Sequence, residues 1–173
     1  MLNTINERQG LELGAVTQLA AILSEREPLL NFKFEELLEP PMPDVRCSAN
    51  GEDIFVEVTH SYGTDADARL ALGRTGKAAP TDRERIESSC IPLQYRFLTP
   101  LNERLKAKAK KIYFATPVWL LIRNALPIWN ETEFRELSCH ITVPEKHPFQ
   151  RIILLCGPRE RFGIIDLIGR HNR

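Results

Sequence analysis

Two acidic residues of a predicted β-hairpin are the first candidates for chemistry in this chain of 173 residues. Asn50 and Gly51 predict a two-residue type I′ turn, because both residue types tolerate positive φ angles. Counting outward from that turn places Asp44 directly opposite Glu57. Opposed carboxylates repel each other across a strand pair, and a bound cation would remove the conflict. The hairpin therefore predicts either a cation site or two solvated carboxylates on an exposed strand face.

Side-chain alternation along the hairpin separates an apolar face from a polar one. The apolar face consists of Val45, Cys47, Ile54, Val56 and Val58. The other face carries both acids and consists of Asp44, Arg46, Ser48, Asp53, Phe55, Glu57 and Thr59. We expect the first face to pack in a core and the second to hold any site.

A third carboxylate lies on the apolar stripe of the first predicted helix, residues 6–26. Glu12 has the i, i+4, i+7, i+11 spacing of one helix face with three apolar residues: Val16, Leu19 and Leu23. A carboxylate that faces a core is costly unless it is paired, hydrogen-bonded or bound to a cation. We expect Glu12 either to meet such a group or to lie at the fringe and reach solvent or Arg8.

A second predicted helix, residues 99–111, places a lysine on its apolar stripe. Thr99 is its expected N-cap, and Pro100 occupies its first turn. The stripe consists of Leu101, Leu105 and Ile112, with Lys108 among them. The ammonium of such a lysine can snorkel to solvent. It can also point at the end of the sheet where Asp44 and Glu57 lie.

The order of the predicted elements indicates an α/β fold. Strands are predicted over residues 32–38, in the two arms of the hairpin, and over residues 118–123, 151–156 and 162–168, with a further helix over residues 130–138. Residues 61–96 form an insertion of loops and short helices. This order, α-β-β-β-α-β and then α-β-β, predicts a central mixed β-sheet flanked by helices. We expect residues 1–173 to form a single domain.

Composition narrows the class of protein. Apolar residues make up 43% and charged residues 27% of the chain, which is ordinary for a globular protein. No apolar run approaches a membrane span, so we expect no membrane partner. The N-terminus lacks a signal-peptide pattern. The four cysteines are widely spaced and form no CxxC pair, which favours reduced thiols in a cytoplasmic protein.

Charge is unevenly distributed although the net charge is zero. Residues 1–60 carry 4 lysines and arginines against 11 aspartates and glutamates, whereas residues 61–111 carry 11 against 6. An acidic part that could hold cations beside a basic part that could hold phosphates fits a nucleic-acid enzyme. An ordinary protein with uneven charge would show the same distribution.

These residues together resemble the PD-(D/E)XK nuclease superfamily, whose fold is restriction-endonuclease-like. Pro43 and Asp44 match its PD element, and Glu57, Val58 and Thr59 match its (D/E)XK element. The resemblance covers roughly residues 6–60 and 97–123. It departs at Thr59, where the superfamily has a lysine. Some branches resemble this chain more closely, with a threonine there and a lysine donated from the second helix.

The resemblance implies a metal-dependent phosphodiesterase that cleaves nucleic acid with a metal-activated water. Its implied catalytic residues are Asp44, Glu57, Lys108 and Glu12, with Lys111 in reserve for Lys108. Mg²⁺ or Mn²⁺ would be held by Asp44, Glu57, the Val58 carbonyl and Glu12, since hard cations prefer oxygen ligands. The implied substrate is DNA or RNA.

Basic residues could track a nucleic-acid backbone without reading its sequence. The candidates are Arg46, Arg69, Arg74, Lys77, Arg83, Arg85 and Lys111. A homodimer or a larger defence or repair complex is a possible assembly. Two alternatives stay open: an inactive nuclease-like module that binds nucleic acid or a protein partner, and an α/β domain with no nucleic-acid role.

Overall fold

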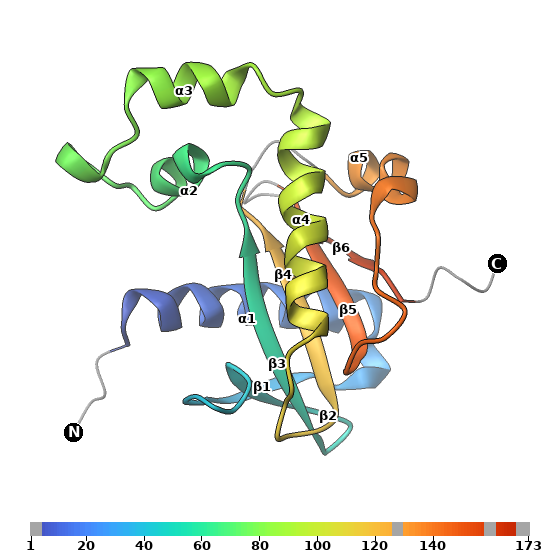
Figure 1. Cartoon of the computed structure of the whole chain (residues 1–173). Coiled ribbons are helices and arrows are strands. Elements are labelled where there is room, and N and C mark those ends of the chain that lie inside the picture. The colour runs from blue at the N-terminus through green and yellow to red at the C-terminus, as the bar shows by residue number, and fades with distance from the viewer. Residues whose placement is uncertain (1–4, 126–129, 158–161, 169–173) are drawn as a thin grey trace.

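Six strands form one mixed β-sheet in the computed structural model, which describes residues 5–125, 130–157 and 162–168 (Figure 1). The strands lie in the order of the chain: β1 (Lys33–Leu37), β2 (Val45–Ala49), β3 (Glu52–Ser61), β4 (Val118–Asn124), β5 (Phe149–Cys156) and β6 (Gly163–Asp166). Strands β3, β4 and β5 run parallel, and the remaining neighbours pair antiparallel. The predicted α/β class with a central mixed sheet is confirmed.

Helices cover both faces of this sheet. The helices are α1 (Glu7–Arg26), α2 (Asp65–Ala71), α3 (Asp82–Ser89), α4 (Leu93–Ala109) and α5 (Glu131–Glu136), with short 3₁₀ turns at Pro28–Leu30, Gly76–Ala78 and Ser138–His140. Helix α1 packs on one face and α4 on the other (Figure 1). Two apolar cores result, one on each side of the sheet.

The hairpin forms in the predicted register. Asn50 and Gly51 have φ angles of 55° and 84°, and the strand pairs run from Ala49 with Glu52 to Val45 with Val56. The five residues of the apolar face are all buried in the core under α1. A local turn signal and a period of two were sufficient to place them.

Helix α4 begins six residues before the predicted start, at Leu93, and Pro100 lies inside it. An internal proline removes one helical hydrogen bond and usually disfavours the helix. Phe97, Leu98 and Leu101 are nevertheless buried together against the sheet, and this burial offsets the loss. The helix ends at Ala109, so Ile112 is 80% exposed and is not part of the stripe.

The predicted insertion contains α2 and α3, while its first and last residues belong to β3 and α4. Both short helices begin with a capping box, Thr64 with Asp67 and Thr81 with Glu84. The buried carboxylate of Asp67 is ion-paired with Arg96 of α4. This pair connects the insertion to the rest of the molecule.

Two further observations concern the described part of the chain as a whole. None of its helices has the length and apolar character needed to cross a membrane. All four cysteines are free thiols, and Cys47 and Cys156 are buried. Burial raises the pKa of the Cys47 thiol to about 12, so this thiol is protonated at neutral pH.

Candidate active site

The candidate site lies where β2 separates from β3. Strand β2 begins at Val45, opposite Val56, and β3 continues past that pair to Ser61 with β4 on one side. Among the described residues, no strand pairs with the other edge of residues 57–61. The edge of β3 is therefore unpaired at this point, with α1 packed on one face of the sheet and α4 on the other.

On this unpaired edge, the Asp44 side chain accepts a hydrogen bond that a neighbouring strand would otherwise accept. Its Oδ2 accepts a hydrogen bond from the Val58 backbone N–H at 2.8 Å, and its side chain is only 5% exposed. The other oxygen, Oδ1, accepts from the Arg8 guanidinium at 2.5 Å. Both oxygens of Asp44 are thus held by donors, one by a backbone N–H and the other by a guanidinium.

Glu12 of α1 shares the Arg8 guanidinium with Asp44. Arg8 Nε donates to Glu12 Oε1 at 2.5 Å, so Glu12 is buried and also meets Arg8, the partner named in the alternative interpretation. Burial raises the pKa of Glu12, the hydrogen bond from Arg8 opposes this, and the neighbouring Asp44 carboxylate raises it further. The Asp44 and Glu12 carboxylates are both buried and share one guanidinium. Their surroundings therefore favour a cation.

Glu57 meets two ammonium groups from the end of α4. Lys108 Nζ lies 2.6 Å and Lys111 Nζ 2.8 Å from the same oxygen, Glu57 Oε1. The other oxygen, Oε2, is buried and accepts no hydrogen bond from any described residue. The predicted proximity of Lys108 to Glu57 is confirmed, and Lys111 reaches the same atom; their catalytic roles stay predictions.

Thr59 stands where the nuclease motif would have a lysine, and it is buried on the same strand face as Glu57. Lys108 thus brings a positive charge to Glu57 from a helix 51 residues further along the chain.

Tyr113 is a member of this site that the sequence did not indicate. Its hydroxyl is buried without a hydrogen-bond partner among the described residues. Burial raises the pKa of this hydroxyl, and the Glu57 and Asp44 carboxylates raise it further. Lys111 Nζ lies 5.2 Å from the centre of the Tyr113 ring. Only the tertiary fold brings this loop residue to the two acids.

The donor set suits a hard divalent cation. It offers carboxylate oxygens from Asp44, Glu57 and Glu12, one of which, Glu57 Oε2, is buried with no donor from the described residues. The described residues contain no cluster of three or more His, Cys, Asp or Glu side chains arranged to hold a metal. Mg²⁺ commonly binds through one or two carboxylates and keeps several waters, so these residues fit that ion.

Most of the predicted phosphate-binding arginines are engaged by acids. Their ion pairs are Arg46 with Glu36 and Asp53, Arg69 with Glu84, Arg74 with Glu7, and Arg83 with Glu87. Lys77 and Arg85 are exposed and form no ion pair with a described residue. Within the insertion, the positive charge counted from the sequence is thus largely neutralised in the fold.

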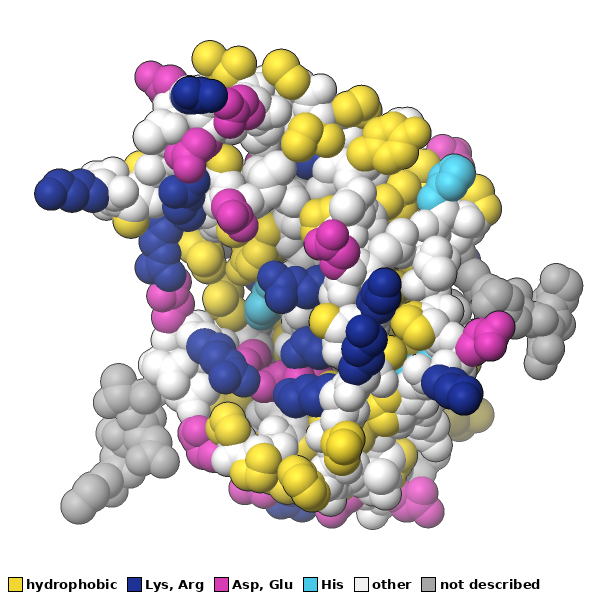
Figure 2. All heavy atoms as spheres, viewed as in Figure 1, with side chains coloured by type: hydrophobic (Ala, Val, Ile, Leu, Met, Phe, Trp, Pro, Cys, Tyr) yellow, Lys and Arg dark blue, Asp and Glu magenta, His cyan; other side chains and the backbone are white. Residues whose placement is uncertain are grey.

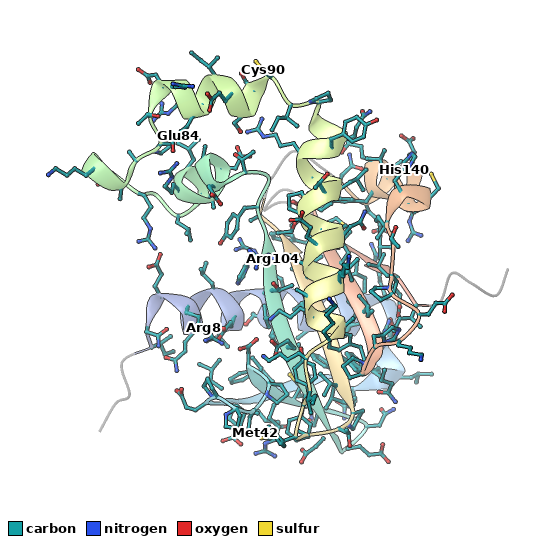
Figure 3. The ribbon with its side chains drawn as sticks, viewed as in Figure 1. Arg8, Met42, Glu84, Cys90, Arg104 and His140 are labelled. Atoms are coloured by element: carbon teal, nitrogen blue, oxygen red, sulfur yellow. The ribbon has the colours of Figure 1, made fainter. Side chains whose placement is uncertain are left out.

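Free cations occur instead beside the acidic site. Arg104 of α4 and Arg123 of β4 form no ion pair with any described residue, and neither was among the predicted phosphate-binding residues. Arg104 precedes Lys108 by four residues, so these two lie on one face of α4. Lysine and arginine side chains gather in the middle of the face in Figure 2, with acidic side chains visible between them. Figure 3 shows Arg104 on α4 and Arg8 near the start of α1.

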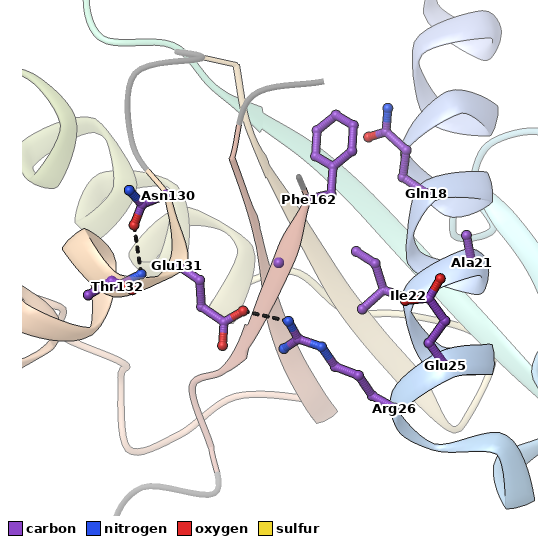
Figure 4. Close-up of a pocket in the computed structure, with 10 residues that line it drawn as sticks. Gln18, Ala21, Ile22, Glu25, Arg26, Asn130, Glu131, Thr132 and Phe162 are labelled. Carbon is purple, nitrogen blue, oxygen red and sulfur yellow. Dashed lines mark hydrogen bonds and ion pairs between the residues drawn. The ribbon is translucent and has the colours of Figure 1, made fainter. Parts of the chain in front are cut away.

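A separate cavity lies away from this site. A space of about 700 Å³ opens between the second half of α1, the start of α5 and β6, and Arg26 and Glu131 form an ion pair across it at 2.7 Å (Figure 4). None of its lining residues belongs to the predicted site. This cavity is therefore separate from the candidate site at Asp44 and Glu57.

Comparisons with known proteins add little to this geometry. No protein-family model matches the chain, and no curated protein matches it. A solved structure that it resembles is Pyrococcus furiosus SfsA in complex with Ca²⁺, with 15% sequence identity and a TM-score of 0.35. The match covers 90% of this chain but 62% of SfsA, so the chain spans less than two thirds of that protein. At this TM-score the likeness establishes neither a shared fold nor a shared function.

Proposed function

We propose that this protein is a divalent-metal-dependent nuclease of the PD-(D/E)XK type. The observation that carries the proposal is the convergence of Lys108 and Lys111 on buried Glu57 beside a strand that has Thr59 in place of the motif lysine. A carboxylate and an ammonium at one buried position are what phosphodiester hydrolysis by a cation-assisted water requires.

Asp44, Glu57, the Val58 carbonyl and Glu12 would hold Mg²⁺ or Mn²⁺. When bound, the ion supplies a Lewis acid that activates water and neutralises charge on the scissile phosphate. Asp44 is kept in place by the Val58 N–H. Glu57 has one oxygen without a donor from the described residues. Arg8, which is 64% exposed, occupies the position between Glu12 and Asp44 and can swing outward to solvent.

Lys108 would orient the attacking water or stabilise the negative charge that develops on the phosphate oxygens. Its side chain is 22% exposed, so it faces both Glu57 and the open side of the site. Lys111 would contact a phosphate oxygen of the substrate from the more exposed side. Both roles need a positive charge held close to Glu57.

Cleavage of labelled single-stranded DNA, duplex DNA and RNA with Mg²⁺ or Mn²⁺ tests the proposal. Asp44→Asn, Glu57→Gln and Lys108→Met should each lower the cleavage rate by about 10²–10³-fold, the usual loss on removing an electrostatic group from an active site. EDTA should abolish cleavage. Lys106→Met is the matched control, because Lys106 lies exposed on the same helix without a described partner, and it should cleave at the wild-type rate.

Metal binding provides a second readout that does not depend on turnover. Addition of 10 mM Mg²⁺ should stabilise the wild type by roughly 1.4 kcal/mol if the dissociation constant is about 1 mM. Glu57→Gln should lose this stabilisation in a thermal melt.

In the cleavage assay, equal rates for the wild type and all variants would contradict the proposal. They would indicate another site or a contaminating nuclease.

A second function is favoured by one observation: the carboxylates are already neutralised by Arg8, Lys108 and Lys111. The chain could then be an inactive nuclease-like module that binds nucleic acid. It would bind labelled nucleic acid in a salt-dependent manner and show no cleavage with either metal. Absence of both cleavage and binding would exclude both functions.

A further inference from the structure

Arg8 bridges two of the three carboxylates of the candidate site. Its Nε donates to Glu12 Oε1 and its Nη2 donates to Asp44 Oδ1, both at 2.5 Å. The side chains of these two acids are only 7% and 5% exposed, whereas the Arg8 side chain is 64% exposed. A guanidinium on a largely exposed side chain thus covers two buried carboxylates.

Both oxygens of Asp44 are engaged in hydrogen bonds. Oδ1 accepts from Arg8, and Oδ2 accepts from the Val58 N–H. Glu57 differs, because both of its lysines bond to Oε1, and its buried Oε2 accepts no hydrogen bond from the described residues. A cation can therefore approach Glu57 directly, whereas at Asp44 it meets an oxygen that Arg8 already holds.

The charges of the side chains that pair at the site balance one another. Three carboxylates face three cations in these ion pairs: Asp44, Glu12 and Glu57 with Arg8, Lys108 and Lys111. A divalent cation added to this set would be repelled by the cations already there, unless one of them leaves. Arg8 is the most exposed of the three, at 64% against 47% for Lys111 and 22% for Lys108. Its departure also frees two acids at once.

We propose that Arg8 and a divalent cation exchange places at this site. Arg8 neutralises Asp44 and Glu12 in the metal-free protein, and the incoming ion displaces it to solvent. This cation exchange rests on the proposed nuclease function and adds a control of metal affinity to it. A site that is open for only part of the time binds its ligand more weakly in the same proportion. Arg8 thus lowers the metal affinity as a competitor and is not itself a ligand of the metal.

The first test measures the binding of Mn²⁺ alone, from the electron paramagnetic resonance signal of the unbound ion. Arg8→Gln should lower the Kd about 10-fold, which corresponds to a wild-type site that is free of Arg8 for about a tenth of the time. Arg26→Gln is the matched control, because Arg26 lies on the same helix and pairs with Glu131 at 2.7 Å, and it should bind as the wild type does. Adding Asp44→Asn to Arg8→Gln should abolish the gain in affinity, which locates the ion at this site.

Thermal melts distinguish the cation exchange from an ion pair with only a structural role. In EDTA, Arg8→Gln should melt at a lower temperature than the wild type, because Asp44 and Glu12 lose their cation. Saturating Mn²⁺ should raise the melting temperature of the variant more than that of the wild type, because the variant binds the ion more tightly. A structural arginine would instead produce the same loss with and without the metal.

A measurement on the wild type does not depend on how well a variant folds. The Arg8 Nε–H is hydrogen-bonded to Glu12, so its proton should be protected from exchange with water. In isotope-labelled protein, Mg²⁺ should weaken the nuclear magnetic resonance signal of this group as the guanidinium moves to solvent. Arg151 is the internal control, because its Nε donates to Asp166 at 2.7 Å, and its signal should not change.

The outcomes separate the cation exchange from the proposed function. An unchanged Kd for Mn²⁺ in Arg8→Gln, or an Arg8 signal that saturating Mg²⁺ leaves unchanged, would overturn the exchange, while cleavage by the wild type would still support the nuclease. Tighter metal binding by Arg8→Gln, without cleavage by either protein, would support the exchange and overturn the nuclease. Absence of metal binding in both proteins would overturn both.

Discussion

Two ion pairs of this molecule, Arg83 with Glu87 and Lys108 with Glu57, differ in burial. In the insertion, the Arg83 and Glu87 side chains are 87% and 61% exposed. At the candidate site, Lys108 is 22% exposed and its partner Glu57 only 2%. The bond lengths are similar, 2.8 Å and 2.6 Å. The two pairs therefore differ in solvent exposure rather than in distance.

Burial decides what such a pair does. An exposed pair contributes at most about 1 kcal/mol, because water solvates both charges when they separate. A buried carboxylate needs its partner, since an unpaired buried charge is strongly unfavourable. The exposed Arg83 pair of α3 therefore contributes little, whereas the buried Glu57 carboxylate depends on its lysines.

Removal of both lysines from Glu57 should produce the largest effect. Lys108→Ala with Lys111→Ala leaves a buried carboxylate without a cation, which should lower the free energy of unfolding by about 3 kcal/mol. Urea denaturation at pH 7.5 without metal measures it. Adding Glu57→Gln to the double variant should restore most of the loss. A triple variant as unstable as the double variant would assign the loss to lysine packing instead.

Acidification should reveal a second buried group at the site. Burial, then Arg123 and Lys108, lower the pKa of His60 to about 4 from the ordinary 6.5. The unfolded chain therefore binds the proton more tightly between these values, and stability falls as pH falls from 6.5 towards 4. From pH 7 to pH 5, His60 should account for a loss of about 2 kcal/mol.

The measurement is urea denaturation of the wild type and His60→Gln at both pH values, in EDTA. The variant should show a weaker pH dependence. His140→Gln is the control, because His140 is exposed, and it should behave as the wild type does. Identical pH dependence in all three proteins would show that His60 is not shielded from water.

The smallest effect is expected in the insertion. Arg83→Ala removes a solvent-exposed i, i+4 pair of α3, so the free energy of unfolding should change by less than about 0.5 kcal/mol. Thermal melts of this variant and of the double lysine variant, run together, compare the two regions directly. A loss above about 1 kcal/mol for Arg83→Ala would remove the contrast between them.

Local patterns predicted a large part of the fold. The Asn50 and Gly51 turn and strand alternation predicted the hairpin register and the buried face of β2 and β3. The helix period predicted that Glu12 is buried with Val16. These patterns have periods of two and 3.6 residues and depend only on near neighbours.

The same reasoning was wrong where distant contacts decide. Helix α4 starts early because Phe97 and Leu98 are buried against strands far away in the sequence. The charge count indicated arginines of the insertion for phosphate binding, but the fold pairs Arg69, Arg74 and Arg83 with acids. It leaves Arg104 and Arg123 without an ion pair among the described residues. A count of charges does not include the partner that each charge meets.

The sequence by itself determined which groups were available: two acids at the open end of a hairpin, one on a helix stripe, and a lysine on another. Tertiary structure decided which of them meet. Strand β2 begins only at Val45, so the Val58 N–H has no partner in β2 and is free to bind Asp44. Helix α4 then packs so that Lys108 and Lys111 reach one oxygen of Glu57. Such contacts join residues 14 and 51 positions apart, and packing of whole elements, rather than any local period, sets their distances.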